Sequence, residues 1–216
     1  MFVEVENYTK IINKQTVLDN INIKMDKGKV YGFKGKNASG KTMLMRAICG
    51  LIKSTKGHVV IDGEIIGKDR SFPKSVGVLI ENPGFIGNYS GFENLKTIAS
   101  IKQIIGDEKI KEILEEVGLN PNDNKKYKKY SLGMKQKLGI AAAIMEEPEI
   151  IILDEPTNGL DENGVLNLRN IIRKHKQRGA LIIISSHDSE ELNFLADEIF
   201  EIESGKIKNH IDNSGR

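Results

Sequence analysis

Eight consecutive residues carry the clearest chemical signal in the chain, because glycine, lysine and threonine recur among them at the spacing G-x-x-x-x-G-K-[ST]. They are Gly35, Lys36, Asn37, Ala38, Ser39, Gly40, Lys41 and Thr42. Glycines let backbone N–H groups turn inward around phosphate oxygens, and the helix that follows points the positive end of its dipole at them. In this pattern the lysine bridges the outer phosphates and the threonine hydroxyl binds Mg²⁺. The segment therefore predicts a site for a nucleoside triphosphate, with Lys41 and Thr42 in those two roles.

Two further groups of polar residues come directly after apolar runs. Asp154 and Glu155 follow the run 149–153, and His187 follows the run 181–184 after two serines. The carboxyl ends of parallel strands form the ligand-binding edge of an α/β sheet, so these side chains should meet the phosphates. We expect Asp154 to hold Mg²⁺, Glu155 to orient and polarise the attacking water, and His187 to donate a hydrogen bond to the γ-phosphate. The plainer alternatives are two acids that cap a strand and a histidine that only packs at the surface.

The segments around these residues have the pattern of an α/β protein. Alternating apolar residues predict half-buried strands, short apolar runs predict buried ones, and a 3.6-residue period predicts helices. The expected strands are 3–5, 21–23, 30–33, 59–63, 76–80, 149–153 and 181–184, and the expected helices are 43–51, 138–145 and an insert from 91 to 118 divided at Gly106. Buried strands separated by helices imply a mostly parallel sheet that is covered on both faces.

Length and composition limit the possible classes of protein. A chain of 216 residues, 39% apolar and 29% charged, suits one globular domain, and no run approaches the ~18 apolar residues that a membrane-spanning helix needs. The first residues lack the basic and then apolar pattern of a secretion signal, and Cys49 is the only cysteine, so we expect a cytosolic protein. The run 125–130 mixes lysines with tyrosines, but a solvated face is favoured there over a nucleic-acid surface.

Segments 131–137 and 158–161 complete a set of five landmarks with the phosphate loop, the run 150–155 and His187. In this order and spacing they resemble the ATP-binding cassette subunits of ABC transporters over nearly the whole chain. The resemblance implies a single ATP-binding domain over residues 1–216 with a P-loop NTPase core, an antiparallel N-terminal β-subdomain and a helical subdomain over about residues 85–145. It also implies ATP and Mg²⁺ as ligands and ATP hydrolysis as the reaction.

In that family two cassettes pack head to tail. The resemblance therefore implies a homodimer, or a pair with a homologous cassette, in which Ser131 and Gly133 complete the γ-phosphate site of the partner. A serine hydroxyl and a helix N-terminus both suit an anion. Asp161, in the segment that matches the D-loop, is expected at the same nucleotide interface.

The chain departs from the family pattern at four positions. Leu132 and Met134 stand where the signature has glycine and glutamine, and Ile12 stands where an aromatic residue stacks on adenine, with Tyr8 four residues earlier. Glu81 replaces the glutamine of the Q-loop, and the sequence Glu-Asn-Pro at 81–83 is similar to that of the bacitracin and lantibiotic resistance exporters. A carboxylate at this place is expected to approach Mg²⁺ as a charged ligand.

The resemblance implies the ATPase subunit of an exporter, with a peptide antibiotic or a similar amphipathic compound as cargo. Its partner would be a separate transmembrane permease that holds it at the inner face of the cell membrane, with segment 85–92 as the candidate contact. An alternative is a soluble cassette ATPase that acts on nucleic acid or ribosomes, but such relatives usually carry two cassettes or a long coiled coil. A P-loop kinase would lack the signature segment and the switch histidine.

Overall fold

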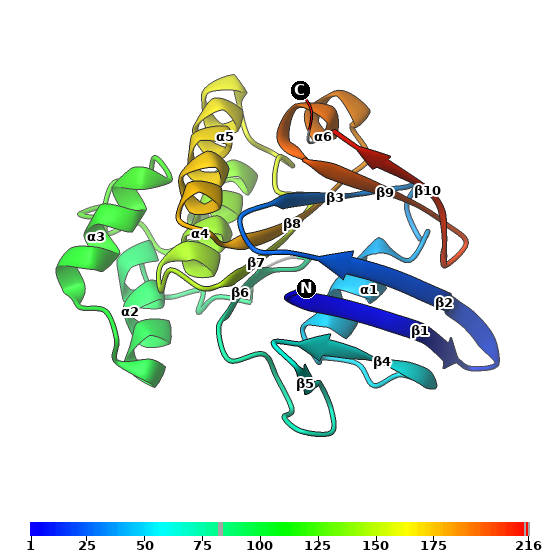
Figure 1. Ribbon diagram of the computed structural model, residues 1–216. Coiled ribbons are helices and arrows are strands. Elements are labelled where there is room, and N and C mark those ends of the chain that lie inside the picture. Colours follow the sequence, from blue (N-terminus) through cyan, green and yellow to red (C-terminus); the bar gives the residue numbers. More distant parts are fainter. Residues whose placement is uncertain (82–83, 214, 216) are drawn as a thin grey trace.

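The computed structural model describes residues 1–81, 84–213 and 215, and it contains two sheets and six α-helices within those residues. The N-terminal sheet is antiparallel, with the strand order β2-β1-β4-β5 (Figure 1). Its strands are β1 (Val3–Ile12), β2 (Gln15–Met25), β4 (Lys56–Ile61) and β5 (Glu64–Ile65). Val3 and Val5 are buried while Glu4 between them is partly exposed, which is the alternation that a one-sided strand requires.

The second sheet is mostly parallel and has the strand order β10-β9-β3-β8-β7-β6. Its strands are β3 (Val30–Lys34), β6 (Val76–Leu79), β7 (Ile150–Asp154), β8 (Leu181–Ser186), β9 (Glu198–Glu203) and β10 (Lys206–Asp212). Only β10 pairs antiparallel, with β9. The expected fold class, a P-loop NTPase core with an antiparallel N-terminal β-subdomain and a helical insert, is confirmed.

The central strands are apolar along their whole length because each face of the sheet packs against its own core. Ile151 and Ile182 lie in one apolar cluster with residues of the helices α4 (Leu132–Ile144) and α5 (Glu162–Gln177). Ile152 and Ile183, on the opposite face, lie in a second cluster with residues of α1 (Lys41–Ile48) and of the antiparallel sheet. Because both faces of the sheet are buried, the runs 150–153 and 181–184 are continuously apolar and do not alternate with polar residues.

The helical insert lies to one side of the sheets. The helices α2 (Gly91–Lys102), α3 (Asp107–Glu116) and α4 fall within the range 85–145, and α2 and α3 lie far from the antiparallel sheet (Figure 1). The helix α4 begins six residues before the alanine-rich segment that predicts it, because the Ser131 hydroxyl caps its first turn. Where α4 crosses β6, a Cβ atom on Gly77 would lie 1.7 Å from the carbonyl oxygen of Ala143, so this crossing requires a glycine.

The sequence patterns missed α5, α6 (Ser189–Leu195), β9 and β10. The strands β9 and β10 are joined by a two-residue turn in which Ser204 and Gly205 have φ angles of 49° and 75°. Positive φ at both turn residues matches the twist of a hairpin. Among the described residues, no helix combines the length and apolar character needed to cross a bilayer.

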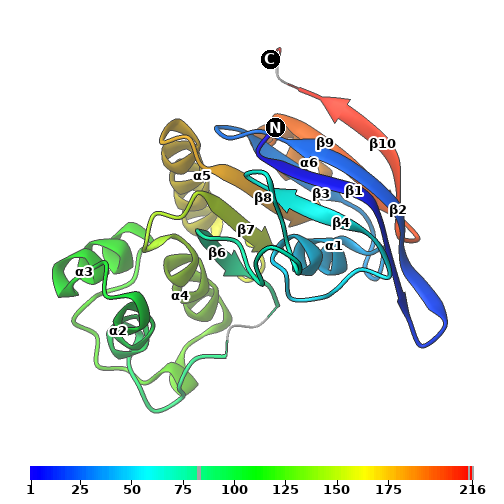
Figure 2. The ribbon, with the colours of Figure 1, turned by 60° about the horizontal axis from the view of Figure 1, so that its bottom comes forward.

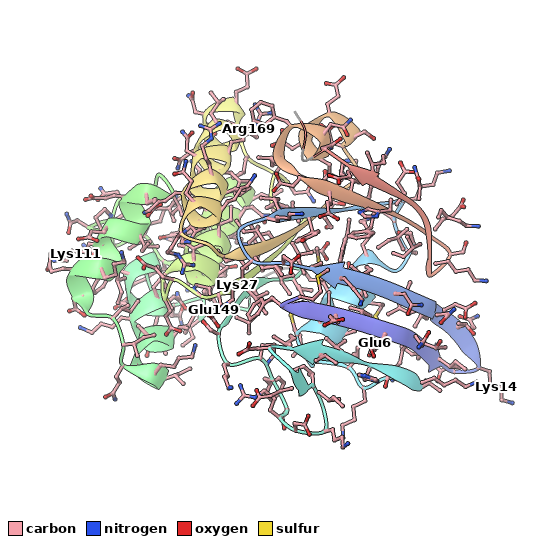
Figure 3. The ribbon with its side chains drawn as sticks, in the orientation of Figure 1. Glu6, Lys14, Lys27, Lys111, Glu149 and Arg169 are labelled. Carbon is pink, nitrogen blue, oxygen red and sulfur yellow. The ribbon has the colours of Figure 1, made fainter. Side chains whose placement is uncertain are left out.

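Charged side chains lie around the outside of the molecule, as Lys14 at the β1–β2 turn and Lys111 on α3 illustrate (Figure 3). Lys27 and Glu149 lie side by side, with the lysine Nζ 2.5 Å from Oε1 of the carboxylate. This ion pair connects the end of the antiparallel sheet with the residue before β7. Because both partners are exposed, its contribution to stability is about 0–1 kcal/mol.

Candidate functional site

A cavity of about 630 Å³ opens at the phosphate loop, within the range of small-molecule sites. Its walls come from β2, from the loop and the start of α1, from the end of β7, and from the β9–β10 turn. They are formed by Gln15, Thr16, Val17, Asn37, Ala38, Gly40, Lys41, Thr42, Met43, Asp154, Glu155, Ser204 and Gly205. The cavity therefore brings the phosphate loop together with Asp154 and Glu155, at the first of the two predicted strand ends.

The loop turns too tightly for ordinary side chains at its two glycines. A Cβ atom on Gly35 would lie 2.4 Å from the carbonyl oxygen of Ile202 and 2.5 Å from Oγ of Ser39. Gly40 has a φ of 113°, a conformation that side chains rarely adopt, and it starts α1 without a side-chain cap. The amides of the first helical turn are consequently available to an anion.

Lys41 is buried at the base of the loop, with 6% of its side chain exposed. Its Nζ donates hydrogen bonds to the carbonyl oxygens of Gly35 at 2.6 Å and Lys36 at 3.3 Å. Oε1 of Glu155 lies 3.8 Å away. The loop carbonyls and one carboxylate thus satisfy a buried cation that can also bridge phosphates.

Asp154 is held between two hydroxyl groups. Thr42 donates from Oγ1 to Oδ2 of Asp154 at 2.7 Å, and Ser185 donates to Oδ1. Hydroxyl and carboxylate oxygens are the donors that Mg²⁺ prefers, and this ion usually takes one or two protein ligands beside water and phosphate oxygens. Within the described part of the chain no cluster of three or more histidine, cysteine, aspartate or glutamate residues could hold a metal. A site shared between Thr42, Asp154 and a bound phosphate therefore fits Mg²⁺.

Glu155 and His187 are brought together by the ends of β7 and β8. The Nδ1 atom of His187 lies 2.9 Å from Oε2 of Glu155, and the histidine side chain is 66% exposed. Among the described residues, the buried atoms Oε1 of Glu155 and Oγ of Ser39 have no hydrogen-bond partner. Buried polar atoms without partners are uncommon in folded proteins. A phosphate group with its attacking water would supply the missing partners.

Three predicted site residues lie away from this cavity and have local structural roles. Oγ of Ser131 accepts a hydrogen bond from the amide of Met134 at 3.2 Å and caps α4, two residues before Gly133. Oδ1 of Asp161 accepts from the amide of Gly164 at 2.8 Å and caps α5. None of Ser131, Gly133 and Asp161 belongs to the cavity wall within one chain.

Glu81 and Ile12 also lie outside the cavity wall. Oε1 of Glu81 pairs with Nη2 of Arg46 on α1 at 2.7 Å, and the glutamate side chain is 61% exposed. Asn82 and Pro83, the rest of the Glu-Asn-Pro sequence, fall outside the described residues. Ile12 ends β1 opposite Gln15 in the β1–β2 hairpin, so Gln15, and not Ile12, reaches the cavity.

The sequence patterns missed six residues of the cavity wall: Gln15, Thr16, Val17, Met43, Ser204 and Gly205. The β9–β10 turn packs on the loop, since the amide of Gly205 donates to the carbonyl oxygen of Ser39 at 2.8 Å. The Ser-Gly pair is a turn signal in the sequence, but nothing local to it indicates a neighbour 165 positions earlier. Only the pairing of β3 with β9 brings the two segments together.

The basic run 125–130 offers little to nucleic acid. The rings of Tyr127 and Tyr130 are buried, with 9% and 8% exposed. Nζ of Lys126 pairs with Glu93 at 3.1 Å, and Nζ of Lys128 donates to Asn88 at 2.8 Å. Aromatic rings that stack on bases must be accessible, and these are not.

Comparison with known proteins agrees with this geometry. The family model of the ABC transporter matches residues 18–158. YybJ of Bacillus subtilis, an ABC transporter ATP-binding protein, is 49% identical over 206 residues. These residues cover 95% of this chain and 94% of the relative. The bacitracin transport ATP-binding protein BcrA of Enterococcus faecalis is 40% identical, and the match covers 97% of this chain and 69% of BcrA. The lantibiotic transport ATP-binding protein SrtF of Streptococcus pyogenes is 39% identical, over 94% and 88%.

Solved structures share the fold at lower identity. The ATP-binding subunit of an ABC transporter superposes with a TM-score of 0.90 at 24% identity, over 100% of this chain and 91% of that one. The dimeric cassette MJ0796 superposes with a TM-score of 0.87 at 21% identity, over 98% of both chains. The family match and the sequence relatives show that this chain belongs to the ABC transporter family. It is an ATP-binding subunit of that family, and its activity is that of an ATPase.

Proposed function

We propose that this chain is the ATPase subunit of an exporter whose cargo is a peptide antibiotic or a similar amphipathic compound. The observation that carries the proposal is the cavity in which Lys41, Thr42, Asp154 and Glu155 meet around one phosphate loop. The cargo class is favoured by the relatives named for bacitracin and lantibiotic transport, at 40% and 39% identity. The Glu-Asn-Pro sequence at 81–83 points to the same branch.

The roles of the site residues follow from their positions. Residues 35–42 cradle the phosphates of ATP, and Lys41 exchanges its bonds to loop carbonyls for bonds to the outer phosphates. Thr42 and Asp154 would hold Mg²⁺, and Glu81 would be a further ligand if its carboxylate exchanged Arg46 for the ion. When bound, this ion neutralises charge on the phosphate oxygens. Glu155 orients the attacking water, while His187 beside it donates a hydrogen bond to the γ-phosphate.

A second cassette completes the site. Ser131 and Gly133 start α4 away from the cavity of their own chain, and in a head-to-tail pair they face the γ-phosphate held by the other chain. Asp161 then lies at the interface between the two cassettes. Bound ATP favours the pair of cassettes, and hydrolysis allows the pair to separate. A difference of a few kcal/mol in nucleotide affinity between the paired and the separated state is therefore enough to move an attached partner. Either a second copy or a homologous cassette can fill this role.

The partner that is moved is a separate transmembrane permease, which holds the cassette at the inner face of the membrane. The segment 85–92 is the candidate contact. Ile86 and Tyr89 are 45% and 41% exposed there, while the ring of Phe85 packs on Tyr127 with 5.2 Å between ring centroids. Exposed apolar side chains on a firmly packed base are suited to a protein partner. The buried tyrosines of the run 125–130 weigh against the alternative of a nucleic-acid partner.

The proposal is tested in bacteria that lack their own copy of the gene, by restoring wild-type protein, Glu155→Gln or Lys41→Ala. The wild-type protein should raise the inhibitory concentration of bacitracin or of a lantibiotic, and it should co-purify with a membrane protein. Both variants should lose the protection, because one does not orient water and the other does not bind the phosphates. Of the two, Glu155→Gln should still bind ATP in a titration of the purified protein. Protection by the variants equal to that of the wild type would exclude this function.

A further inference from the structure

We propose that Gln136 is a positioning residue for Glu155, through which the signature helix α4 holds the hydrolytic carboxylate of its own chain in place. The inference rests on the proposed function, because it takes Glu155 as the group that orients water. Gln136 does not line the cavity. It acts on the backbone that carries the carboxylate.

The side chain of Gln136 is one of the few polar groups inside the molecule, with 9% of the residue exposed. Its Nε2 donates a hydrogen bond to the carbonyl oxygen of Glu155 at 3.1 Å. A buried amide is unfavourable unless it makes hydrogen bonds, so this contact fixes where the side chain points. The helix α4 lies beside β6 and β7 (Figure 2). The hydrogen bond to Glu155 places Gln136 at the end of β7.

The backbone of Glu155 needs support from its neighbours. Its φ angle is 47°, in the left-handed region, which is uncommon and unfavourable for a residue other than glycine. The amide of Glu155 is anchored to Ser185 of β8, at 3.0 Å from Oγ and 3.2 Å from the carbonyl oxygen. Its carbonyl oxygen accepts from Gln136 and also from the amide of Asn158 at 3.2 Å, which closes a turn. Gln136 thus ties the start of this turn to α4.

The first turn of α4 also contacts the segment 155–159 at a second place. A Cβ atom on Gly133 would lie 2.5 Å from the carbonyl oxygen of Gly159, and a Cβ atom on Gly159 would lie 2.6 Å from Cγ of Leu132. The helix therefore contacts both ends of the segment 155–159. Since Ser131 begins this helix, the element proposed to meet the nucleotide of a partner cassette is hydrogen-bonded to the backbone of Glu155 in its own chain.

Loss of the amide should displace the carboxylate without changing the phosphate loop. Glu155 now lies 2.9 Å from Nδ1 of His187 and 3.8 Å from Nζ of Lys41, and both distances depend on its backbone conformation. A shift of about 1 Å in a catalytic group is enough to lower a rate by about 100-fold. ATP binding, which depends on residues 35–42, should stay the same.

The experiment compares Gln136→Met, which keeps the length of the side chain but has no donor, with Gln177→Met, which changes an exposed glutamine at the end of α5. We expect kcat for ATP hydrolysis to fall about 10- to 100-fold in Gln136→Met. KM and the dissociation constant for a non-hydrolysable ATP analogue should stay within about twofold, and Gln177→Met should match the wild type. Gln136→Glu, which places a carboxylate oxygen against the carbonyl, provides a second variant with the same expected loss if the methionine variant folds poorly.

A double variant shows whether Gln136 acts through Glu155. In a Glu155→Gln background, Gln136→Met should change neither nucleotide affinity nor the ATP-bound dimer fraction, whereas a general structural defect would lower both. Such a decrease would overturn the inference, and so would wild-type kcat in both Gln136 variants. If the wild-type protein itself does not hydrolyse ATP, the proposed function fails instead. The two failures are therefore distinguishable.

Discussion

Glu81 carries a charge that has two possible partners in this protein. Its carboxylate now pairs with Arg46 at 2.7 Å, outside the cavity wall, although the sequence predicts it as a ligand of Mg²⁺. The pair is well exposed on the glutamate side, so it contributes about 1 kcal/mol at most and can exchange for a stronger partner. A divalent cation beside phosphate is such a partner.

Two substitutions at this pair should shift the magnesium requirement in opposite directions. Glu81→Gln removes the charged ligand, so the Mg²⁺ concentration for half-maximal ATP hydrolysis should rise a few-fold. Arg46→Met removes the competing cation, so that concentration should fall. The measurement is a Mg²⁺ titration at saturating ATP, with Glu108→Gln, an exposed acid on α3, as the control. Unchanged titrations in both variants would mean that the carboxylate never approaches the metal.

At the scale of elements, α5 buries a histidine against the helical subdomain. His175 is 2% exposed and its Nε2 has no hydrogen-bond partner among the described residues. Burial, reinforced by the charge of Arg178, lowers the pKa of His175 from 6.5 to about 4. The other charged groups that act on its pKa are Glu116, Lys174 and Glu147. The folded protein thus keeps this ring neutral where the unfolded chain would protonate it.

The depressed pKa of His175 predicts a loss of stability in mild acid. The unfolded state binds the extra proton first, so the free energy of unfolding should fall as the pH drops from about 6.5 to about 4, by on the order of 3 kcal/mol. Urea denaturation at several pH values should show a shallower slope for His175→Leu than for the wild type. Parallel curves for the wild type and His175→Leu would contradict this assignment.

At the scale of the whole molecule, the proposed pairing would join two separate parts of the chain into one site. Its cavity contains the phosphate loop, Asp154 and Glu155, while the start of α4, with Ser131, lies elsewhere on the same chain. A hydroxyl and a helix N-terminus that do not serve their own cavity are suited to the cavity of a neighbour. The proposed pairing therefore predicts an effect of Ser131 on assembly and not on binding by one chain.

Ser131→Ala should weaken the ATP-bound dimer and leave the affinity of the monomer for ATP nearly unchanged. In a Glu155→Gln background, which should accumulate that dimer, we expect the dimerisation constant to fall about 10-fold or more, as for loss of a hydrogen bond to a charged group. Light scattering after size-exclusion chromatography measures the dimer, and Ser100→Ala on the exposed face of α2 is the control. A thermal melt corrects for the lost helix cap, about 1 kcal/mol. Equal losses in dimerisation and in monomer affinity would refute the head-to-tail pair.

The phosphate loop, the strand-end acids and the fold class were all predictable from the amino-acid sequence. These features are local, because a fixed spacing of glycines, lysine and threonine sets the backbone of one loop, and a carboxylate after an apolar run must stand at a sheet edge. The clustering of Lys41, Thr42, Asp154 and Glu155 follows from those two facts. The helix α5 was not predicted, because most of its residues are polar and only a narrow stripe of side chains, which includes Leu168 and Ile172, is buried.

The residues that complete the site from distant parts of the chain depend on the packing of whole elements. Val17 and Gly205 share a cavity wall because the β9–β10 turn packs on β2, and Gln136 reaches Glu155 because Gly77 lets α4 lie close on β6. The same packing gave Glu81 a partner in Arg46. Contacts of this kind depend on strand order and on how closely helices approach the sheet. The spacing of residues along one segment indicates neither the strand order nor how closely a helix approaches the sheet.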